Sequence, residues 1–206
     1  MSIPTYGDKK VWKEESQPFE INWWRENWSL NKIRNQEFID KMKNEFGFTE
    51  DSFAGKTILD IGAGPRSWPS LLLNKAKIII VEPLAYEFVT FNDGYYKLPN
   101  ITKVYSLPGE ECVEELINNI DIVWCFNTLN HCYEWKKVID NIEKYLKSNG
   151  KLYMKVRVAE SPHNGHVGVK HDEFLEYLHN SKLYGRIYPD SVDSTNCYLV
   201  EGTKKP

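Results

Sequence analysis

Short apolar runs alternate with stretches of helical spacing through most of this chain. Five runs are β-branched or continuously apolar, as strands buried on both faces of a sheet should be: Thr57–Ile61, Ile78–Val81, Thr102–Tyr105, Ile120–Phe126 and Leu152–Val158. The stretches between them predict helices over Ser67–Lys75, Glu110–Asn118 and Trp135–Leu146. Alternation of this kind predicts an α/β fold, with a mostly parallel sheet and helices on both of its faces.

The two ends of the chain depart from this alternation. Residues 19–28 are rich in aromatic side chains, and Phe38, Met42 and Phe46 then recur at four-residue steps before Gly47. This pattern predicts two helices ahead of the main fold. After a helix near Lys170–His179, two apolar runs at residues 183–188 and 196–201 follow each other closely. We therefore expect a hairpin that ends the sheet with an antiparallel strand. The predicted organisation is a helical cap at residues 1–50 and an α/β domain at residues 51–206, in one compact unit.

Composition narrows the class of protein. The chain has 206 residues, of which 41% are hydrophobic and 27% charged, and this excludes a disordered or collagen-like chain. A formal net charge of −3 disfavours a nucleic-acid binder. The four cysteines form no C-x-x-C pair, no apolar signal segment is visible, and the longest aliphatic run, Ile78–Val81, is too short to cross a bilayer. We therefore expect a soluble cytoplasmic protein with reduced thiols and no membrane partner.

The strongest local motif follows the first predicted strand. Asp60-Ile-Gly62-Ala63-Gly64 places two glycines where a buried strand must turn, so that the backbone can approach a ligand closely. The next strand ends at Glu82, 18 positions after Gly64. A carboxylate there can accept hydrogen bonds from both hydroxyls of a ribose. An ordinary strand–helix turn and a solvated carboxylate would explain each feature alone, but their spacing favours a nucleoside cofactor.

The motifs together resemble those of the class I S-adenosylmethionine-dependent methyltransferases. Ser67 stands where a dinucleotide-binding loop has its third glycine, whereas Asp60–Gly64 and the strand ending at Glu82 are similar to the first two motifs of that family. Residues 121–131 resemble its fourth strand with the following loop, and residues 147–153 its turn into strand five. The resemblance implies a Rossmann-like seven-stranded sheet with a C-terminal antiparallel strand. It also implies S-adenosyl-L-methionine as cofactor and S-adenosyl-L-homocysteine as product.

The resemblance also assigns candidate cofactor-binding residues. Asp60 and the glycine turn would face the methionyl end, Glu82 the ribose, Glu110 the adenine amino group, and Asn127 the methionine moiety. For Glu110, a carboxylate in the first turn of a helix is an equally good explanation. The full candidate set is Asp60, Gly62, Ala63, Gly64, Glu82, Pro83, Glu110 and Asn127.

Absent motifs restrict the reaction. No Asn/Asp-Pro-Pro-Tyr/Phe and no Pro-Cys follows strand four, which disfavours methylation of nucleobases. No cluster with metal-ligand spacing is present, so we expect no metal. His131 and His166 lie on loops at the predicted ligand edge, where a neutral imidazole can accept a hydroxyl proton. The alternative is that His131 orders its loop and that His166 is a solvated loop residue.

The aromatic cap also has two interpretations. It covers one edge of the sheet, or it is a lid whose Glu20, Trp24 and Trp28 line the acceptor pocket; this segment is similar to one in sugar-modifying members of the family. We predict an enzyme that methylates an oxygen of a small molecule or saccharide. One alternative is an NAD(P)-dependent short-chain reductase, because Tyr133 and Lys137 form Tyr-x-x-x-Lys; another is a non-catalytic cofactor-binding subunit. The sequence specifies neither the acceptor, nor the oligomeric state, nor a protein partner.

Overall fold

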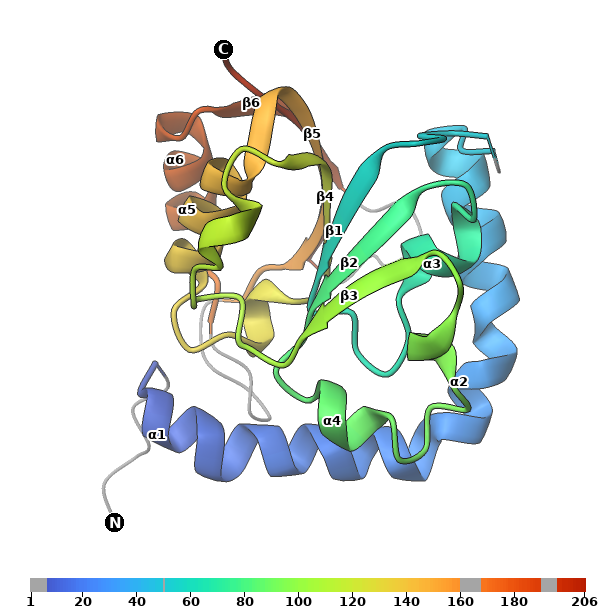
Figure 1. Ribbon diagram of the computed structural model, residues 1–206. Helices are drawn as coiled ribbons and strands as arrows, with labels where there is room; N and C mark the ends of the chain where they lie inside the picture. Colours follow the sequence, from blue (N-terminus) through green and yellow to red (C-terminus); the bar gives the residue numbers. More distant parts are fainter. Residues whose placement is uncertain (1–6, 50, 160–167, 190–195) are drawn as a thin grey trace.

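A seven-stranded sheet forms the centre of the molecule in the computed structural model, which describes residues 7–49, 51–159, 168–189 and 196–206 (Figure 1). The strand order is β3-β2-β1-β4-β5-β7-β6, and β7 runs antiparallel to both of its neighbours. The first five strands pair in parallel. The predicted fold class, including the antiparallel strand near the C-terminus, is therefore confirmed. The strands are β1 Thr57–Ile61, β2 Lys77–Val81, β3 Ile101–Tyr105, β4 Ile120–Phe126, β5 Leu146–Arg157, β6 Leu183–Pro189 and β7 Cys197–Lys204.

Each face of the sheet has its own hydrophobic core. On one face, Leu59 and Ile61 of β1 pack with apolar side chains of α5 (Trp135–Tyr145) and α6 (His171–Asn180). On the other face, Ile58 packs with residues of α3 (Trp68–Leu72) and α4 (Ala85–Phe88). Adjacent strand residues point to opposite faces, so one apolar strand supplies both cores.

A long helix replaces the two helices predicted at the N-terminus. α1 (Lys9–Val11), a π-helical turn (Trp12–Ser16) and α2 (Gln17–Phe46) follow one another without a break. No glycine or proline interrupts residues 19–46, so nothing in the sequence forces the helix to end before Gly47, which takes a left-handed conformation with φ 65°. Figure 1 shows that this helix bends, so that it has two arms. The first arm, which begins at Lys9, crosses below the carboxyl ends of the strands, and the second arm, which ends at Phe46, runs beside the sheet.

Other predicted elements are shorter or shifted. Residues 110–118 contain only a short 3-10 turn, Glu114–Leu116, and α3 covers only part of the predicted 67–75 helix. β5 begins at Leu146, directly after α5, instead of at Leu152. The Asn149-Gly150 pair lies inside that strand and does not end the helix. A 3-10 turn also covers Tyr95–Lys97 and another Leu129–His131.

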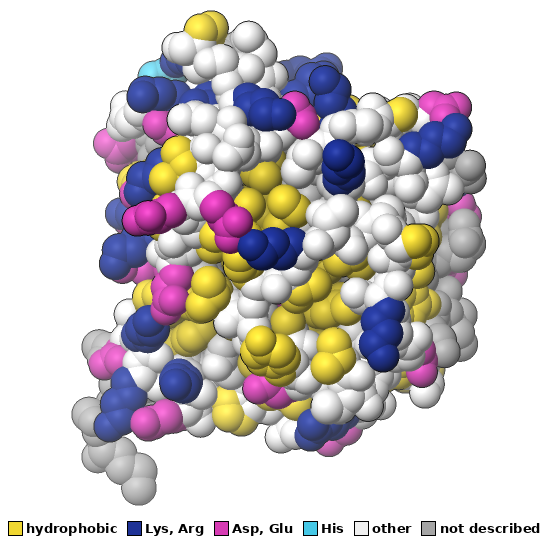
Figure 2. Space-filling model, viewed as in Figure 1, with side chains coloured by type: hydrophobic (Ala, Val, Ile, Leu, Met, Phe, Trp, Pro, Cys, Tyr) yellow, Lys and Arg dark blue, Asp and Glu magenta, His cyan; other side chains and the backbone are white. Residues whose placement is uncertain are grey.

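One edge of the sheet is open on the face seen in Figure 2. β3 is the edge strand, and its three central residues are exposed. Figure 2 shows apolar side chains over the middle of this face, with charged side chains mostly around them. Lys103 of β3 pairs with Glu115 at 2.7 Å, and such a charge blunts an edge against pairing with another chain. Among the described helices, none is long and apolar enough to span a bilayer.

Candidate active site

A cavity of about 600 Å³ lies between the carboxyl ends of the strands and the first arm of the long helix. Its walls come from the loops after β1, β2, β3 and β4, and its roof comes from residues 12–24. Open α/β sheets bind ligands at this edge, because strands that run in parallel bring their following loops together there. The position of the cavity therefore follows from the topology of the sheet.

The loop after β1 is a tight glycine turn. Gly62 and Gly64 have φ values of 71° and 61°, a region that L side chains rarely adopt. A Cβ atom at Gly62 would lie 2.3 Å from the Thr128 side chain, so only glycine fits there. Thr128 in turn donates a hydrogen bond from Oγ1 to the Ile61 carbonyl at 2.9 Å. The turn is thus fixed against the loop that follows β4.

Two buried carboxylates stand beside this turn. Glu82 accepts backbone hydrogen bonds from Gly64 and Leu84, both at 2.9 Å. Burial raises the pKa of Glu82 and of Asp60 to about 7 in each case. Asp60 is 2% exposed, and its Oδ2 has no hydrogen-bond partner among the described residues. A buried acceptor of this kind fits a ligand that brings its own donor, such as an ammonium group or a hydroxyl.

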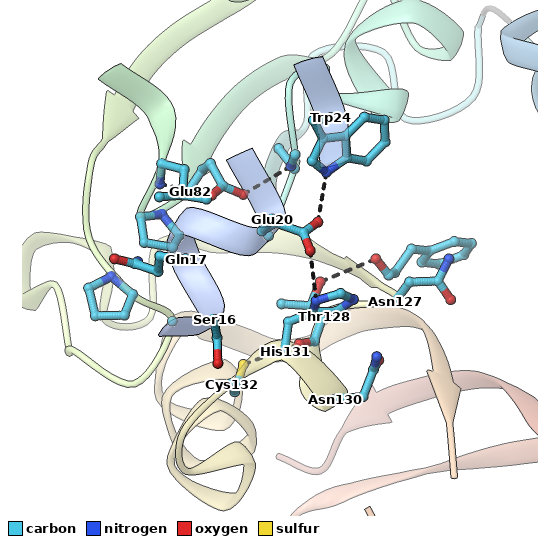
Figure 3. A pocket seen from close by; sticks show the side chains of 18 of the residues that line it. Ser16, Gln17, Glu20, Trp24, Glu82, Asn127, Thr128, Asn130, His131 and Cys132 are labelled. Atoms are coloured by element: carbon cyan, nitrogen blue, oxygen red, sulfur yellow. Dashed lines mark hydrogen bonds and ion pairs between the residues drawn. The ribbon is translucent and has the colours of Figure 1, made fainter. Parts of the chain in front are cut away.

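Glu20 in the roof of the cavity lies next to His131, which belongs to the loop after β4 that forms the floor. Figure 3 shows its carboxylate between Trp24 and His131. One oxygen accepts a hydrogen bond from Trp24 Nε1 at 2.7 Å, and the other lies 3.4 Å from His131 Nδ1. Trp12 Nε1 donates to the backbone carbonyl of His131 at 2.7 Å. Two residues of the helix therefore hold the loop that carries the imidazole.

The structure brings nearly all of the predicted site residues to this one cavity. Its lining includes Glu20, Trp24, Asp60, Gly62, Ala63, Gly64, Glu82, Pro83, Glu110, Asn127 and His131. Trp28 is not among the lining residues: its indole donates to Asp93 at 2.9 Å and packs edge-on against Phe91 and Tyr95. His166 lies outside the described residues.

Glu110 does not lie in the first turn of a helix of its own, which was one of the two roles considered for it. The segment after it is not helical, and one oxygen of its carboxylate accepts hydrogen bonds from the backbone of Tyr133 and Glu134, at 2.7 and 3.1 Å. These amides lie just before α5, so Glu110 interacts with the start of a helix distant in sequence instead of its own. It still lines the cavity, and a contact with a ligand there stays a prediction.

Sequence reasoning missed several lining residues, namely Trp12, Arg66, Trp68, Thr128 and Arg157. Arg66 and Thr128 carry a usable signal, because both stand within a few residues of a strand end at the ligand edge. Trp12 carries none, because its place depends on the path of the long helix. Among the described residues, no three His, Cys, Asp or Glu side chains are grouped closely enough to hold a metal ion.

Comparisons with known proteins agree with this geometry. Residues 30–189 match a family model described as a methyltransferase domain. A ubiquinone biosynthesis O-methyltransferase of Coxiella burnetii is 20% identical over 152 residues, which are 72% of this chain and 64% of the relative. The match thus spans less than two thirds of that relative's length.

Solved structures share the fold at low identity. The 1,6-didemethyltoxoflavin-N1-methyltransferase of Burkholderia thailandensis, with its substrate and S-adenosylhomocysteine bound, gives a TM-score of 0.68 at 12% identity, covering 100% of this chain and 93% of that one. The N-methyltransferase NodS of Bradyrhizobium japonicum, in complex with S-adenosylhomocysteine, gives 0.62 at 13% identity, covering 83% and 87%. At these identities the likeness concerns the fold.

Proposed function

The chain belongs to the methyltransferase domain family, and from this we propose that it transfers a methyl group from S-adenosylmethionine to an oxygen of a small-molecule acceptor. One observation carries the proposal. The same cavity contains a glycine turn flanked by Asp60 and Glu82, and an imidazole, that of His131, which contacts the roof. The first group suits a nucleoside with an amino-acid end. The second suits removal of a proton from an acceptor.

The cofactor would supply a methyl group already activated by a sulfonium. Glu82 would hold the ribose hydroxyls with lone pairs left after its two backbone contacts. The unpartnered Oδ2 of Asp60 would accept a hydrogen bond from the amino group, directly or through water. Asn127, at φ 55° after β4, and the glycine turn would face the methionyl end.

His131 would act as the base for the acceptor hydroxyl. Its Nδ1 lies 3.4 Å from a carboxylate oxygen of Glu20, and the imidazole would take the proton as the oxygen is methylated. Glu20 would be a positioning residue that orients the ring through that contact. Catalysis would then consist mostly of alignment plus proton removal, because the transferred group needs no further activation. His166 stays a second candidate base.

The acceptor would lie under the aromatic part of the roof. Phe19, Trp23 and Trp24 line the cavity, and flat apolar faces suit either an aromatic ring or the C–H face of a sugar. The Coxiella relative, an O-methyltransferase of ubiquinone biosynthesis, favours an oxygen acceptor. We therefore propose a phenol or a saccharide hydroxyl as the methylated group.

The reductase alternative loses its support. Lys137 Nζ pairs with Glu134 at 2.6 Å, while the ring of Tyr133 packs edge-on against Trp12. The two residues therefore have other partners, and the family match is to methyltransferases. The non-catalytic subunit is distinguished by experiment: such a protein would bind cofactor but consume none with any acceptor.

Calorimetry with the purified chain tests the proposal. We expect S-adenosylhomocysteine to bind and NADH not to bind. Glu82→Ala should weaken binding by about 1.5–3 kcal/mol, because it removes a charged acceptor from the ribose site. Glu115→Ala, which changes an exposed carboxylate paired with Lys103, serves as the control and should leave binding unchanged. Binding of NADH in place of S-adenosylhomocysteine would refute the assignment.

A further inference from the structure

Arg66 is a buried cation without a carboxylate partner. Its residue is 2% exposed, and its Nε and Nη1 atoms have no hydrogen-bond partner in the described part of the chain. No described Asp or Glu forms an ion pair with it. Buried charges in proteins are normally paired, because removing them from water costs several kcal/mol. We therefore expect a ligand group to face this guanidinium.

Three tryptophan rings lie close to the guanidinium of Arg66. Its central carbon lies 4.6 Å from the ring centre of Trp68, 5.4 Å from that of Trp28 and 6.0 Å from that of Trp24. Aromatic faces attract a cation but give it no hydrogen-bond acceptor. The rings therefore contact the cation without pairing its N–H groups, which point outward within the guanidinium plane. We call these three tryptophans the cage. They contact the guanidinium but leave its Nε and Nη1 atoms without a hydrogen-bond partner in the described part of the chain.

Arg66 belongs to the same cavity as the proposed cofactor residues. It follows Gly64 by two positions and lines the cavity together with Asp60 and Glu82. Burial lowers its pKa to about 10, so the side chain stays charged at neutral pH. Trp28 does not line the cavity, but its ring lies next to the guanidinium of Arg66, which does.

We propose that Arg66 binds the carboxylate of a ligand in this cavity, a step that rests on the proposed function. A carboxylate matches the planar fork with two parallel hydrogen bonds and neutralises a single buried charge. Two ligands can bring it: the amino-acid end of the cofactor, or an acceptor that carries an acid group. The chemistry is the same for both sources, and binding measurements separate them.

The first measurement is calorimetry of Arg66→Met with two adenosine ligands. S-adenosylhomocysteine carries a carboxylate, whereas 5′-methylthioadenosine lacks the amino-acid end. If the cofactor supplies the carboxylate, the substitution weakens S-adenosylhomocysteine about 10- to 150-fold, equivalent to 1.5–3 kcal/mol, and leaves methylthioadenosine unchanged. Equal weakening of both ligands would indicate a general disturbance of the cavity and would overturn the proposal.

The second measurement uses benzoate as a probe for an acidic acceptor, with the neutral benzamide as its control. If the acceptor supplies the carboxylate, benzoate raises the melting temperature of the S-adenosylhomocysteine complex, benzamide does not, and Arg66→Met abolishes the effect. Unchanged responses to all these ligands in Arg66→Met would refute the role of Arg66. Failure of S-adenosylhomocysteine to bind the unsubstituted protein would instead refute the proposed function, and benzoate alone would still test Arg66.

Two further variants guard against a folding defect. Arg66→Lys keeps the charge but loses the fork, so the affected ligand should again bind more weakly. Arg186→Met changes an arginine that is exposed and paired with Glu201 on β7, and should alter no binding. The melting temperature of the free protein provides an independent readout. Removing an unpaired buried charge should raise it in Arg66→Met, whereas a purely structural arginine would lower it.

Discussion

Asp60 and Glu82 show how burial sets the charge of single residues in this cavity. Both carboxylates are shielded from water, and this raises the pKa of each to about 7. Glu82 recovers part of the cost through two backbone hydrogen bonds, whereas one oxygen of Asp60 has no partner among the described residues. The free protein therefore keeps a destabilising group where the proposed ligand would bring a donor.

The pKa of Asp60 predicts a particular dependence of stability on pH. Between about pH 4 and pH 7 the unfolded chain loses this proton while the folded protein keeps it, so the unfolding free energy falls as pH rises through that window. Asp60→Asn removes this loss. We expect the variant to exceed the unsubstituted protein in stability at pH 8 by on the order of 2–4 kcal/mol, and to match it near pH 4.

Urea unfolding at both pH values measures this difference. Asp51→Asn makes the same substitution at an exposed carboxylate and serves as the matched control. A gain in stability for Asp60→Asn that is the same at pH 4 and at pH 8 would contradict the raised pKa.

His131 is the residue on which the proposed proton transfer depends. His131→Gln keeps a polar side chain of similar size but cannot take the proton, so methyl transfer to the best of a panel of phenols and sugars should slow by about 10²–10⁴-fold. Affinity for S-adenosylhomocysteine should stay within about twofold, because the proposed cofactor contacts lie elsewhere in the cavity.

Glu20→Gln provides the companion measurement, because the proposed role of Glu20 is to orient the ring of His131. Its loss should lower the rate less than the loss of His131 does, because the imidazole would remain and lose only the contact that orients it. Undiminished turnover in His131→Gln would exclude this base. His166, the second candidate base, is tested in the same way. Full turnover in both single variants and in the double variant would indicate an acceptor that reacts without losing a proton, such as a carboxylate.

The long helix both packs against the core and forms the roof of the cavity. Its second arm is fixed to the core, where Phe46 lies 5.3 Å from Phe48 and 5.5 Å from Tyr153, measured between ring centres. Contacts that hold its first arm at the cavity include the ion pair of Lys9 with Glu111 at 2.7 Å and the edge-on packing of Trp12 against Tyr133. The anchor and the roof are thus separable by truncation.

Deleting residues 1–16 should remove part of the roof without loosening the core. We expect a melting temperature close to that of the full chain but weaker binding of S-adenosylhomocysteine and slower turnover, because water then enters the cavity. Deleting residues 1–46 also removes Phe46 and should produce a protein that aggregates through the exposed apolar face. Lys9→Ala, which breaks only the exposed ion pair, is the control. Normal turnover after the shorter deletion would show that residues 1–16 are only a cover.

The elements also indicate where sequence patterns succeed. The predicted bounds of β1 and β4 match the structure to the residue, because a strand buried on both faces must be largely apolar. The region after Glu110 looked helical but is not, because contacts distant in sequence decide it. Val113 donates its N–H to the hydroxyl of Tyr145 at 2.8 Å, and Glu110 accepts from the segment before α5. No local pattern encodes such partners.

For the whole molecule, the order of the strands determines how much of the site the sequence could reveal. Parallel strands end at one edge, so residues that follow strands, such as Gly64, Glu82 and Asn127, could be placed together from their positions alone. The sequence analysis missed Arg66 and Trp12, because their contacts depend on the path of the helix that crosses this edge. Trp28 of the same helix lies next to Arg66 but does not line the cavity.

The contact between Glu20 and His131 has a consequence for the timing of a catalytic cycle. The two residues belong to the roof and to the floor, so any opening that admits or releases a ligand separates them. If His131 is the base, the proposed proton removal and the exchange of ligands therefore take place at different moments. We predict that turnover slows as solvent viscosity rises, while the first cycle stays fast.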